Sequence, residues 1–229
     1  MKTRTTLMHS CLVTVINYKK KVIKTIAAYC LLTIFASCGP TIYKSTNFES
    51  SRKTIKTLAV LSFDVSMDTK KLPKGVTVET LKESLKETGF AMQNAAYTWL
   101  LQRENNYTAT IQDVDKTNAI LKKANISYDD IALQDKGELC KLLSVDGIIS
   151  GKATLSKPMS EGAAVTVGLL SGAWVSTNKT AATLTIHNGS GELLWKYDYE
   201  TSGSVGSSSA NLTNALMKNA SKKFPYTNQ

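Results

Sequence analysis

Two neighbouring stretches of alternating residues constrain the fold of this chain more than any other feature. Apolar residues occupy every second position in 182–187 and again in 193–201, with polar residues between them. Asn188-Gly189-Ser190-Gly191 separates the two stretches, and an Asn-Gly pair in this position is typical of a β-hairpin. We therefore expect two antiparallel strands with one buried face and one wetter face. His187 falls on the wetter face, with Thr183 and Thr185, and is expected to be an exposed strand residue.

Further patterns predict the rest of the domain. Strands are expected at Thr57–Phe63, Tyr107–Gln112 and Val145–Leu155, and the hairpin strands at Val175–His187 and Leu193–Thr201. Helical spacing is found from Val78 to Trp99, where Gly89 could divide or bend the helix, and around Ile131–Leu143. Asp115 or Thr117 is expected to cap a helix through Lys123, Asp129-Asp130 to form another cap, and Ser207–Ala210 to start the last helix. The order β-α-β-α-α-β-β-β-α predicts an α/β (α+β) fold, a single mixed sheet with helices packed against it.

The N-terminal segment has the features of a bacterial lipoprotein signal peptide. Four lysines between positions 19 and 24 precede an apolar core of 11 residues, Thr25–Phe35. Phe35-Ala36-Ser37-Cys38 follows and resembles a lipobox, which predicts cleavage between Ser37 and Cys38 and lipidation of Cys38. The core is far shorter than the ~20 residues of a spanning helix. A short buried helix is the alternative, but residues 1–37 contain six basic and no acidic side chains, which favours a targeting segment.

The charge of the chain belongs largely to this leader. The whole sequence has 28 basic and 18 acidic residues, a net charge of +10. Without the six basic residues of the leader, 22 basic residues remain against 18 acidic ones, a net charge of +4 over 192 residues. Basic side chains in this part are scattered, so no nucleic-acid partner is expected. The length suits one domain, predicted at 55–226, and 38–54 is expected to be an acylated, flexible tether.

No catalytic residue and no metal ligand set is indicated. Cys140 is the only thiol left once Cys38 is acylated, and it lies among leucines in an expected helix, so we interpret it as a buried structural residue rather than a nucleophile. Two short matches to known motifs fail. A calcium loop starting at Asp113 has Asn118 and Ala124 where Gly and Glu are needed, and a phosphate loop starting at Gly147 is one residue short. No cofactor and no small-molecule substrate is expected.

The uncharged segment Gly162–Val175 allows three interpretations. It is expected to be a buried element of the domain, a surface for a partner or for self-association, or an element that dips into the membrane. Gly168 and Gly172 allow close backbone approach, and the apolar side chains beside them that would make the contact are Leu169, Leu170 and Trp174. Its alternation is poor for a pore strand, so a channel is the minority interpretation.

Three segments together resemble a periplasmic α/β domain found in several lipoprotein families. They are Leu58–Phe63, in which Ser62 stands where the family pattern has Pro, Ser144–Gly151, and His187–Trp195. The families are the curli-secretion lipoproteins, the outer-membrane lipoprotein activators of penicillin-binding proteins, and the N-terminal domain of the Tol–Pal translocation protein. The resemblance implies a non-catalytic binding or assembly component of the cell envelope. The alternative that it implies is an oligomeric secretion or export channel subunit.

Location and partners follow from the same features. Gly39 is not the Asp that marks retention in the inner membrane of well-known Gram-negative lipoproteins, so a lipid anchor in the outer membrane, facing the periplasm, is expected. The expected partners are the membrane, through the lipid, and another envelope protein or a second copy of this chain.

Overall fold

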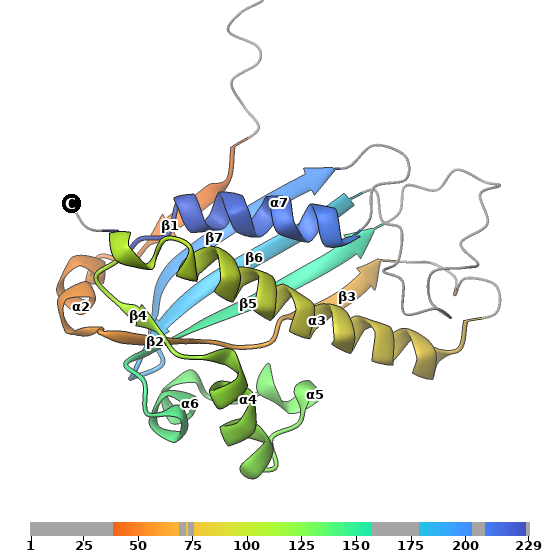
Figure 1. Ribbon diagram of the computed structural model, residues 1–229, viewed down its shortest axis with the longest axis horizontal. Helices are drawn as coiled ribbons and strands as arrows, with labels where there is room; N and C mark the ends of the chain where they lie inside the picture. The colour runs from red at the N-terminus through yellow and green to blue at the C-terminus, as the bar shows by residue number, and fades with distance from the viewer. Residues whose placement is uncertain (1–38, 69–71, 73–75, 157–178, 203–208, 228–229) are drawn as a thin grey trace, which may run out of the picture. The chain divides into compact units, whose positions relative to one another are not determined.

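The structure of this chain is a computed structural model that describes residues 39–68, 72, 76–156, 179–202 and 209–227. All of the described elements lie in one compact unit, Pro40–Gln229 (Figure 1). The leader with Ser37 and Cys38, and the segment 162–175, lie outside the described residues.

The centre of the unit is one mixed sheet of seven strands. Its order is β1-β7-β6-β5-β2-β4, with β3 also paired to β5. The pairs β5–β6, β6–β7 and β7–β1 are antiparallel, whereas β2 and β3 are parallel to β5 and β4 is parallel to β2. The strands are β1 Thr41–Lys44, β2 Thr57–Val60, β3 Asp64–Asp68, β4 Thr110–Ile111, β5 Gly147–Ser156, β6 Lys179–Asn188 and β7 Leu193–Ser202.

Helices cover the two faces of the sheet unequally. The long helix α3 and the C-terminal helix α7 lie side by side across one face, as Figure 1 shows. On the other face α4 and α6 pack beside β2 and the first residues of β5, with the short α5 between them in the chain. The helices are α2 Phe48–Thr54, α3 Val78–Leu101, the 3-10 turn Glu104–Asn106, α4 Val114–Lys123, α5 Tyr128–Ile131, α6 Lys136–Leu143 and α7 Ser209–Lys222.

Each face has its own hydrophobic core. The larger core lies under α3 and α7 and is built from the alternate residues of the strands, including Ile149, Leu184, Trp195 and Tyr197. The smaller core joins α4, α5 and α6 to the opposite side of β2 and to Ile148 of β5. Because successive side chains of a strand point to opposite faces, one strand contributes to both cores.

The predicted fold class is confirmed, and the element order roughly matches the predicted one, with β1, α2 and β3 as unpredicted elements. The hairpin lies where the alternation placed it. Asn188 accepts hydrogen bonds through Oδ1 from the backbone N–H groups of Ser190 (3.1 Å) and Glu192 (2.9 Å). Gly191 has φ +80°, a conformation that glycine adopts at no steric cost. The tight turn therefore depends on one side-chain cap and one glycine.

Several boundaries differ from the predicted ones. Helix α3 is continuous through Gly89, and its first residue Val78 is 61% exposed instead of facing the core. The cap of α4 is Asp113, whose side chain accepts from the N–H groups of Asp115 and Lys116; Asp115 is in the first turn. The expected helix 131–143 is two helices, α5 and α6, and α5 is capped by Ser127 together with Asp130.

The expected tether is also shorter than predicted. Thr41–Lys44 pairs with β7 as an edge strand, and α2 follows with its Phe48 buried against Tyr226. The polar composition of 38–54 hid these elements, because an edge strand and a short surface helix bury few side chains and so show no clear period. The described fold therefore begins at Thr41 rather than at residue 55.

Candidate functional site

The side of the sheet opposite α3 and α7 is only partly covered by described helices. Beyond α5 and α6, strands β3, β5, β6 and β7 expose their alternate side chains to solvent. These side chains are polar: Asp64 and Ser66 of β3, Ser150, Lys152 and Thr154 of β5, Thr183 and Thr185 of β6, Lys196 and Asp198 of β7. We call this surface the open face.

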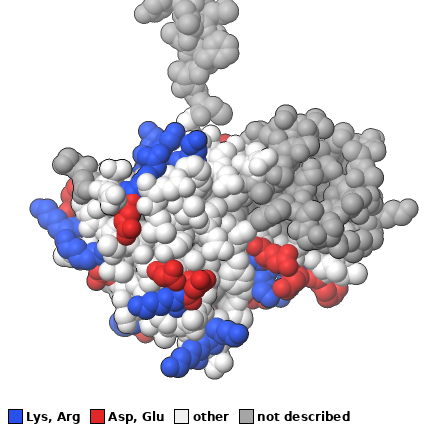
Figure 2. Space-filling model, in the orientation of Figure 1, with Lys and Arg blue, Asp and Glu red and all other residues white. Residues whose placement is uncertain are grey.

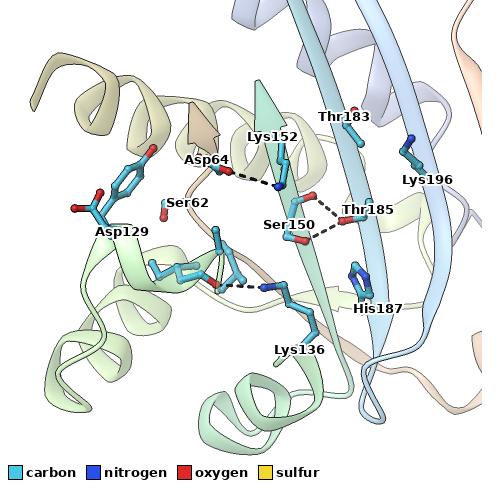
Figure 3. Close-up of a pocket in the computed structure, with 15 residues that line it drawn as sticks. Ser62, Asp64, Asp129, Lys136, Ser150, Lys152, Thr183, Thr185, His187 and Lys196 are labelled. Carbon is cyan, nitrogen blue, oxygen red and sulfur yellow. Dashed lines mark hydrogen bonds and ion pairs between the residues drawn. The ribbon is translucent and has the colours of Figure 1, made fainter. Parts of the chain in front are cut away.

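A hollow of about 460 Å³ lies where the open face meets α5 and α6 (Figure 3). Its wall on one side is formed by α5 and the start of α6, and on the other side by β5, β6 and β7. Its base includes Ser62, in the short connection between β2 and β3. The polar lining is Ser62, Asp64, Tyr128, Asp129, Lys136, Ser150, Lys152, Thr183, Thr185, His187 and Lys196.

Tyr128 fixes the connection at the base of the hollow. Its hydroxyl donates to the carbonyl of Phe63 (2.5 Å) and accepts from the N–H of Val65 (3.3 Å). These backbone groups lie at the break between β2 and β3, where the sheet ladder is interrupted. The phenol therefore replaces hydrogen bonds that a continuous strand would make and holds α5 against the sheet.

Both carboxylates in the lining have a cationic partner. Asp64 lies 3.7 Å from the ammonium of Lys152, and Asp129 lies 2.6 Å from Lys82 of α3. Lys196 is paired with Asp198 at 2.9 Å. These pairs are exposed, so each contributes little to stability. Within each pair, however, the carboxylate and the ammonium neutralise each other's charge.

Lys136 has a different environment. Its ammonium donates to two backbone carbonyls, Ile131 (3.2 Å) and Gln134 (3.0 Å), and no ion pair to it is found among the described residues. Its pKa is lowered from the usual value, first by burial and then by the charge of Lys152, against the attraction of Asp135. Lys136 therefore brings a positive charge to the wall that no contacting carboxylate neutralises.

Two polar atoms at the hollow are buried without a hydrogen-bond partner in the described structure. They are Oγ of Ser62, whose residue is 5% exposed, and Nδ1 of His187. The pKa of His187 is lowered, first by burial and then by the charge of Lys136. His187 was expected to be exposed on the wetter face: the face is correct, but the residue is half-buried because the start of α6 approaches it.

Cys140 is buried on α6, as predicted, and its thiol donates to the carbonyl of Asn188 at 3.7 Å. Burial, with the charges of Asp146 and Asp135, raises the pKa of Cys140 to about 11. A thiol with this pKa is protonated at neutral pH and is a poor nucleophile. It does not line the hollow, and no hydrogen bond connecting it to His187 is found in the part of the chain that the structure describes.

The remaining predicted sites lie beyond what the structure describes. Cys38, Ser37 and the association residues Gly168, Leu169, Leu170, Gly172 and Trp174 belong to undescribed segments, so lipidation and association stay predictions. The described residues contain no helix long and apolar enough to cross a membrane and no cluster of three potential metal ligands. On the surface seen in Figure 2, described basic and acidic side chains are interspersed instead of forming one extended basic area.

Sequence reasoning missed the hollow. The expected absence of a small-molecule site was an inference from motifs, and the lining residues come from six separate elements with no common motif. One signal was available: Ser62 stands where the resembling families have Pro. Its consequence depends on a contact between distant segments, which spacing along the chain cannot predict.

The described residues form a single α/β domain with a polar hollow on one face of its sheet. No protein-family model matches the sequence, and no curated protein matches it. A PelC dodecamer from Paraburkholderia phytofirmans is similar in structure, with 12% identity and a TM-score of 0.44 over 83% of this chain and 100% of that chain. The LpoB C-terminal domain from Salmonella enterica has 12% identity and a TM-score of 0.34, over 65% of this chain and 83% of that one.

Lipoprotein GNA1162 from Neisseria meningitidis has 12% identity and a TM-score of 0.38, over 73% of this chain and 94% of that chain. The resemblance to lipoprotein domains that we expected from the sequence is supported in part: a lipoprotein is among the similar structures, but no sequence family is shown. At these values the likeness carries no argument about function.

Proposed function

We propose that this chain is a lipid-anchored, non-catalytic binding component of the bacterial cell envelope, attached through Cys38 to the periplasmic side of the outer membrane. One observation carries the proposal. The lipobox predicts a new N-terminus at Cys38, and the compact unit begins at Pro40. The predicted cleavage would therefore remove the leader and leave the whole described domain, as maturation of a lipoprotein requires.

The anchor would hold the domain close to the membrane. Each buried methylene of an acyl chain contributes about 0.8 kcal/mol, so two or three chains make attachment effectively permanent. Thr41, the first residue of β1, is three residues after Cys38, and three extended residues span at most roughly 10 Å. The edge of the sheet at β1 would accordingly lie next to the lipid headgroups.

Two surfaces are available for a partner. The open face presents hydroxyl and charged side chains of both signs, which suits a polar ligand or a polar protein surface. The outer edge of β1 has no strand paired with it among the described residues, and Ile42 and Tyr43 there are 40% and 50% exposed. Such an edge can accept a strand from another envelope protein or from a second copy of this chain. No observation on the described residues favours the alternative of a channel subunit.

Maturation at Cys38 is the direct test. We expect the wild-type chain to incorporate labelled palmitate, to fractionate with outer membranes and to begin at Cys38 by mass spectrometry. Cys38→Ser should abolish all three. Cys30→Ser is the matched control, because Cys30 is in the leader but outside the lipobox. A wild-type chain that starts at Met1 in the soluble fraction would overturn the proposal.

The binding role needs a separate experiment. In-cell cross-linking of the anchored protein, followed by mass spectrometry, should identify an envelope protein or a second copy. Replacing Gly168 and Gly172 with leucine tests whether the segment 162–175 takes part. Unchanged partners and an unchanged oligomeric state in this variant would remove the segment from the contact surface.

A further inference from the structure

The hollow has an excess of positive charge at one wall. Of the three lysines that line it, Lys152 and Lys196 have carboxylate partners at 3.7 Å and 2.9 Å. Among the described residues, the ammonium of Lys136 donates to the backbone carbonyls of Ile131 and Gln134 and has no carboxylate partner. Figure 3 shows Lys136 at the start of α6, in one wall of the hollow, and His187 on β6, in the other wall. The charge of Lys136 reaches this ring, since it helps to lower the pKa of His187. A negatively charged group placed between Lys136 and His187 would therefore be stabilised by both.

The hollow also contains polar groups whose hydrogen-bonding capacity is unused. Leaving a buried polar atom without a partner costs about 1–3 kcal/mol, and both Oγ of Ser62 and Nδ1 of His187 are in this state. A buried hydroxyl that stabilises the fold is normally hydrogen-bonded, as the hydroxyls of Ser150 and Thr185 are to each other at 2.8 Å. The hydroxyl of Ser62 is buried at the base of the hollow and has no such bond. An occupant with oxygen atoms would bring acceptors and donors to these two atoms.

The size and the other lining groups define the occupant further. About 460 Å³ falls within the range of sites for small molecules. It is larger than an inorganic anion needs. The lining also has the hydroxyls of Thr183 and Thr185, which donate to Asp198 and to the carbonyl of Ser150 and keep lone pairs that can accept. These groups hydrogen-bond to the hydroxyls of a sugar-sized ligand as readily as to water.

We infer that the hollow binds a small hydroxyl-bearing anion, a sugar phosphate or a sugar carboxylate, with its charged group between Lys136 and His187 and its hydroxyls on the open face. The inference rests on the proposed binding role and names its ligand class. It does not depend on the lipid anchor, because the affinity is measured on purified protein. A chain that is not lipidated in cells could still bind the anion in this experiment.

Affinity measurements on the full chain in a non-ionic detergent test the inference. By calorimetry, glucose 6-phosphate or glucuronate should bind at least about tenfold more tightly than glucose, because hydrogen bonds to charged groups contribute about 1.5–3 kcal/mol. Comparing the two anions, with inorganic phosphate as a third probe, distinguishes a phosphate from a carboxylate ligand. Equal binding of glucose and both anions, or no binding of either anion, would overturn the inference.

Variants of Lys136 test the position of the charge. Lys136→Gln should weaken binding of the preferred anion at least about tenfold, whereas Lys141→Gln should not change it, because Lys141 is on the same helix but is exposed and paired with Glu138 at 2.8 Å. Lys136→Arg keeps the charge and should retain most of the affinity, which separates loss of charge from loss of folding. Equal affinities in Lys136→Gln and Lys141→Gln would refute the assignment.

The wild-type protein supplies a readout that needs no variant to fold. The NMR signal of His187 should titrate at higher pH when the anion is bound, because a nearby negative charge stabilises the protonated ring. Glucose should leave the pKa of His187 unchanged. The sequence has two histidines, His9 and His187, and the signal that is lost in His187→Gln identifies His187. An unmoved pKa with saturating anion would place the ligand elsewhere. The charged groups around this ring and the hollow are Asp64, Asp129, Asp135, Lys136, Lys152 and Lys196.

Discussion

The replacement of Gly151 by alanine tests the packing that positions the hollow. Gly151 lies in β5 and turns its missing side chain toward the larger core, where the ring of Phe63 lies directly on it. A Cβ atom at this position would be 2.2 Å from Cε1 and 2.3 Å from Cδ1 of Phe63. Carbon atoms in contact are about 3.5–4.0 Å apart, so the ring or the strand has to move by more than about 1 Å. Phe63 is fully buried, so its ring is surrounded by other protein atoms.

The expected loss of stability follows from two opposing effects. Overpacking of a core costs about 1–3 kcal/mol, and an overlap above 1 Å favours the upper half of that range. Alanine regains roughly 0.5–1 kcal/mol because it orders the unfolded chain more than glycine does. We therefore expect Gly151→Ala to lower the free energy of unfolding by about 2 kcal/mol, or the melting temperature by about 4–8 °C for a domain of this size.

Urea unfolding of the mature chain, followed by tryptophan fluorescence, measures this change, because Trp195 is buried in the same core. Gly189→Ala is the control: its nearest neighbour would be the carbonyl oxygen of Asp146 at 3.6 Å, an ordinary contact, and we expect a change below about 0.5 kcal/mol. Phe63→Leu should partly relieve the clash. The double variant should be less destabilised than the sum of the single ones by at least about 1 kcal/mol. Strict additivity, or a Gly151→Ala protein as stable as wild type, would refute the packing argument.

Three further predictions concern single residues. Asp113→Ala should lower the free energy of unfolding by about 1 kcal/mol, because its side chain caps α4 through two N–H groups, while Asp115→Ala should have little effect in the same urea experiment. Cys140 should resist iodoacetamide at pH 8 in the folded protein and react after unfolding, because burial raises the pKa of its thiol to about 11; mass spectrometry measures the modified fraction. Between pH 7 and pH 5 the wild-type chain should lose more stability than His187→Gln, measured by thermal unfolding across that range.

The sign of the pH effect follows from proton binding. Burial lowers the pKa of His187 below its usual value in the folded state, so in this window the unfolded chain binds more protons than the folded chain. The protein therefore begins to lose stability when the pH falls through the pKa of His187 in the unfolded chain. The loss continues until the pH reaches the lower pKa of His187 in the folded chain. Parallel pH curves for the two proteins would contradict the assigned shift. Rapid modification of folded Cys140, or equal losses for Asp113→Ala and Asp115→Ala, would contradict the other two predictions.

The periods of the sequence predicted the hairpin strands β6 and β7 and the helices α3 and α7, but not the strands β1 and β3. In β6 the buried side chains are Ala182, Leu184 and Ile186, as the period of two requires, and in α7 Leu212, Leu216 and Ala220 face the core, as the period near 3.6 requires. These patterns survive because burial of one face is a local property of each element. Caps and edge elements were predicted less well: Asp113 and Asp115 are equally good caps by composition, and only the backbone path decides between them.

The sequence by itself determined the fold class, the approximate order of the elements, the hairpin at Asn188–Gly191 and the burial of Cys140. The leader 1–37 and the lipidation of Cys38 stay predictions. Only the tertiary structure decided that β1 and α2 belong to the fold and that Ser62, Lys136 and His187 line one hollow. The reason is physical. A period records which side of an element is buried, whereas a binding site depends on which distant elements meet, and no local pattern records that.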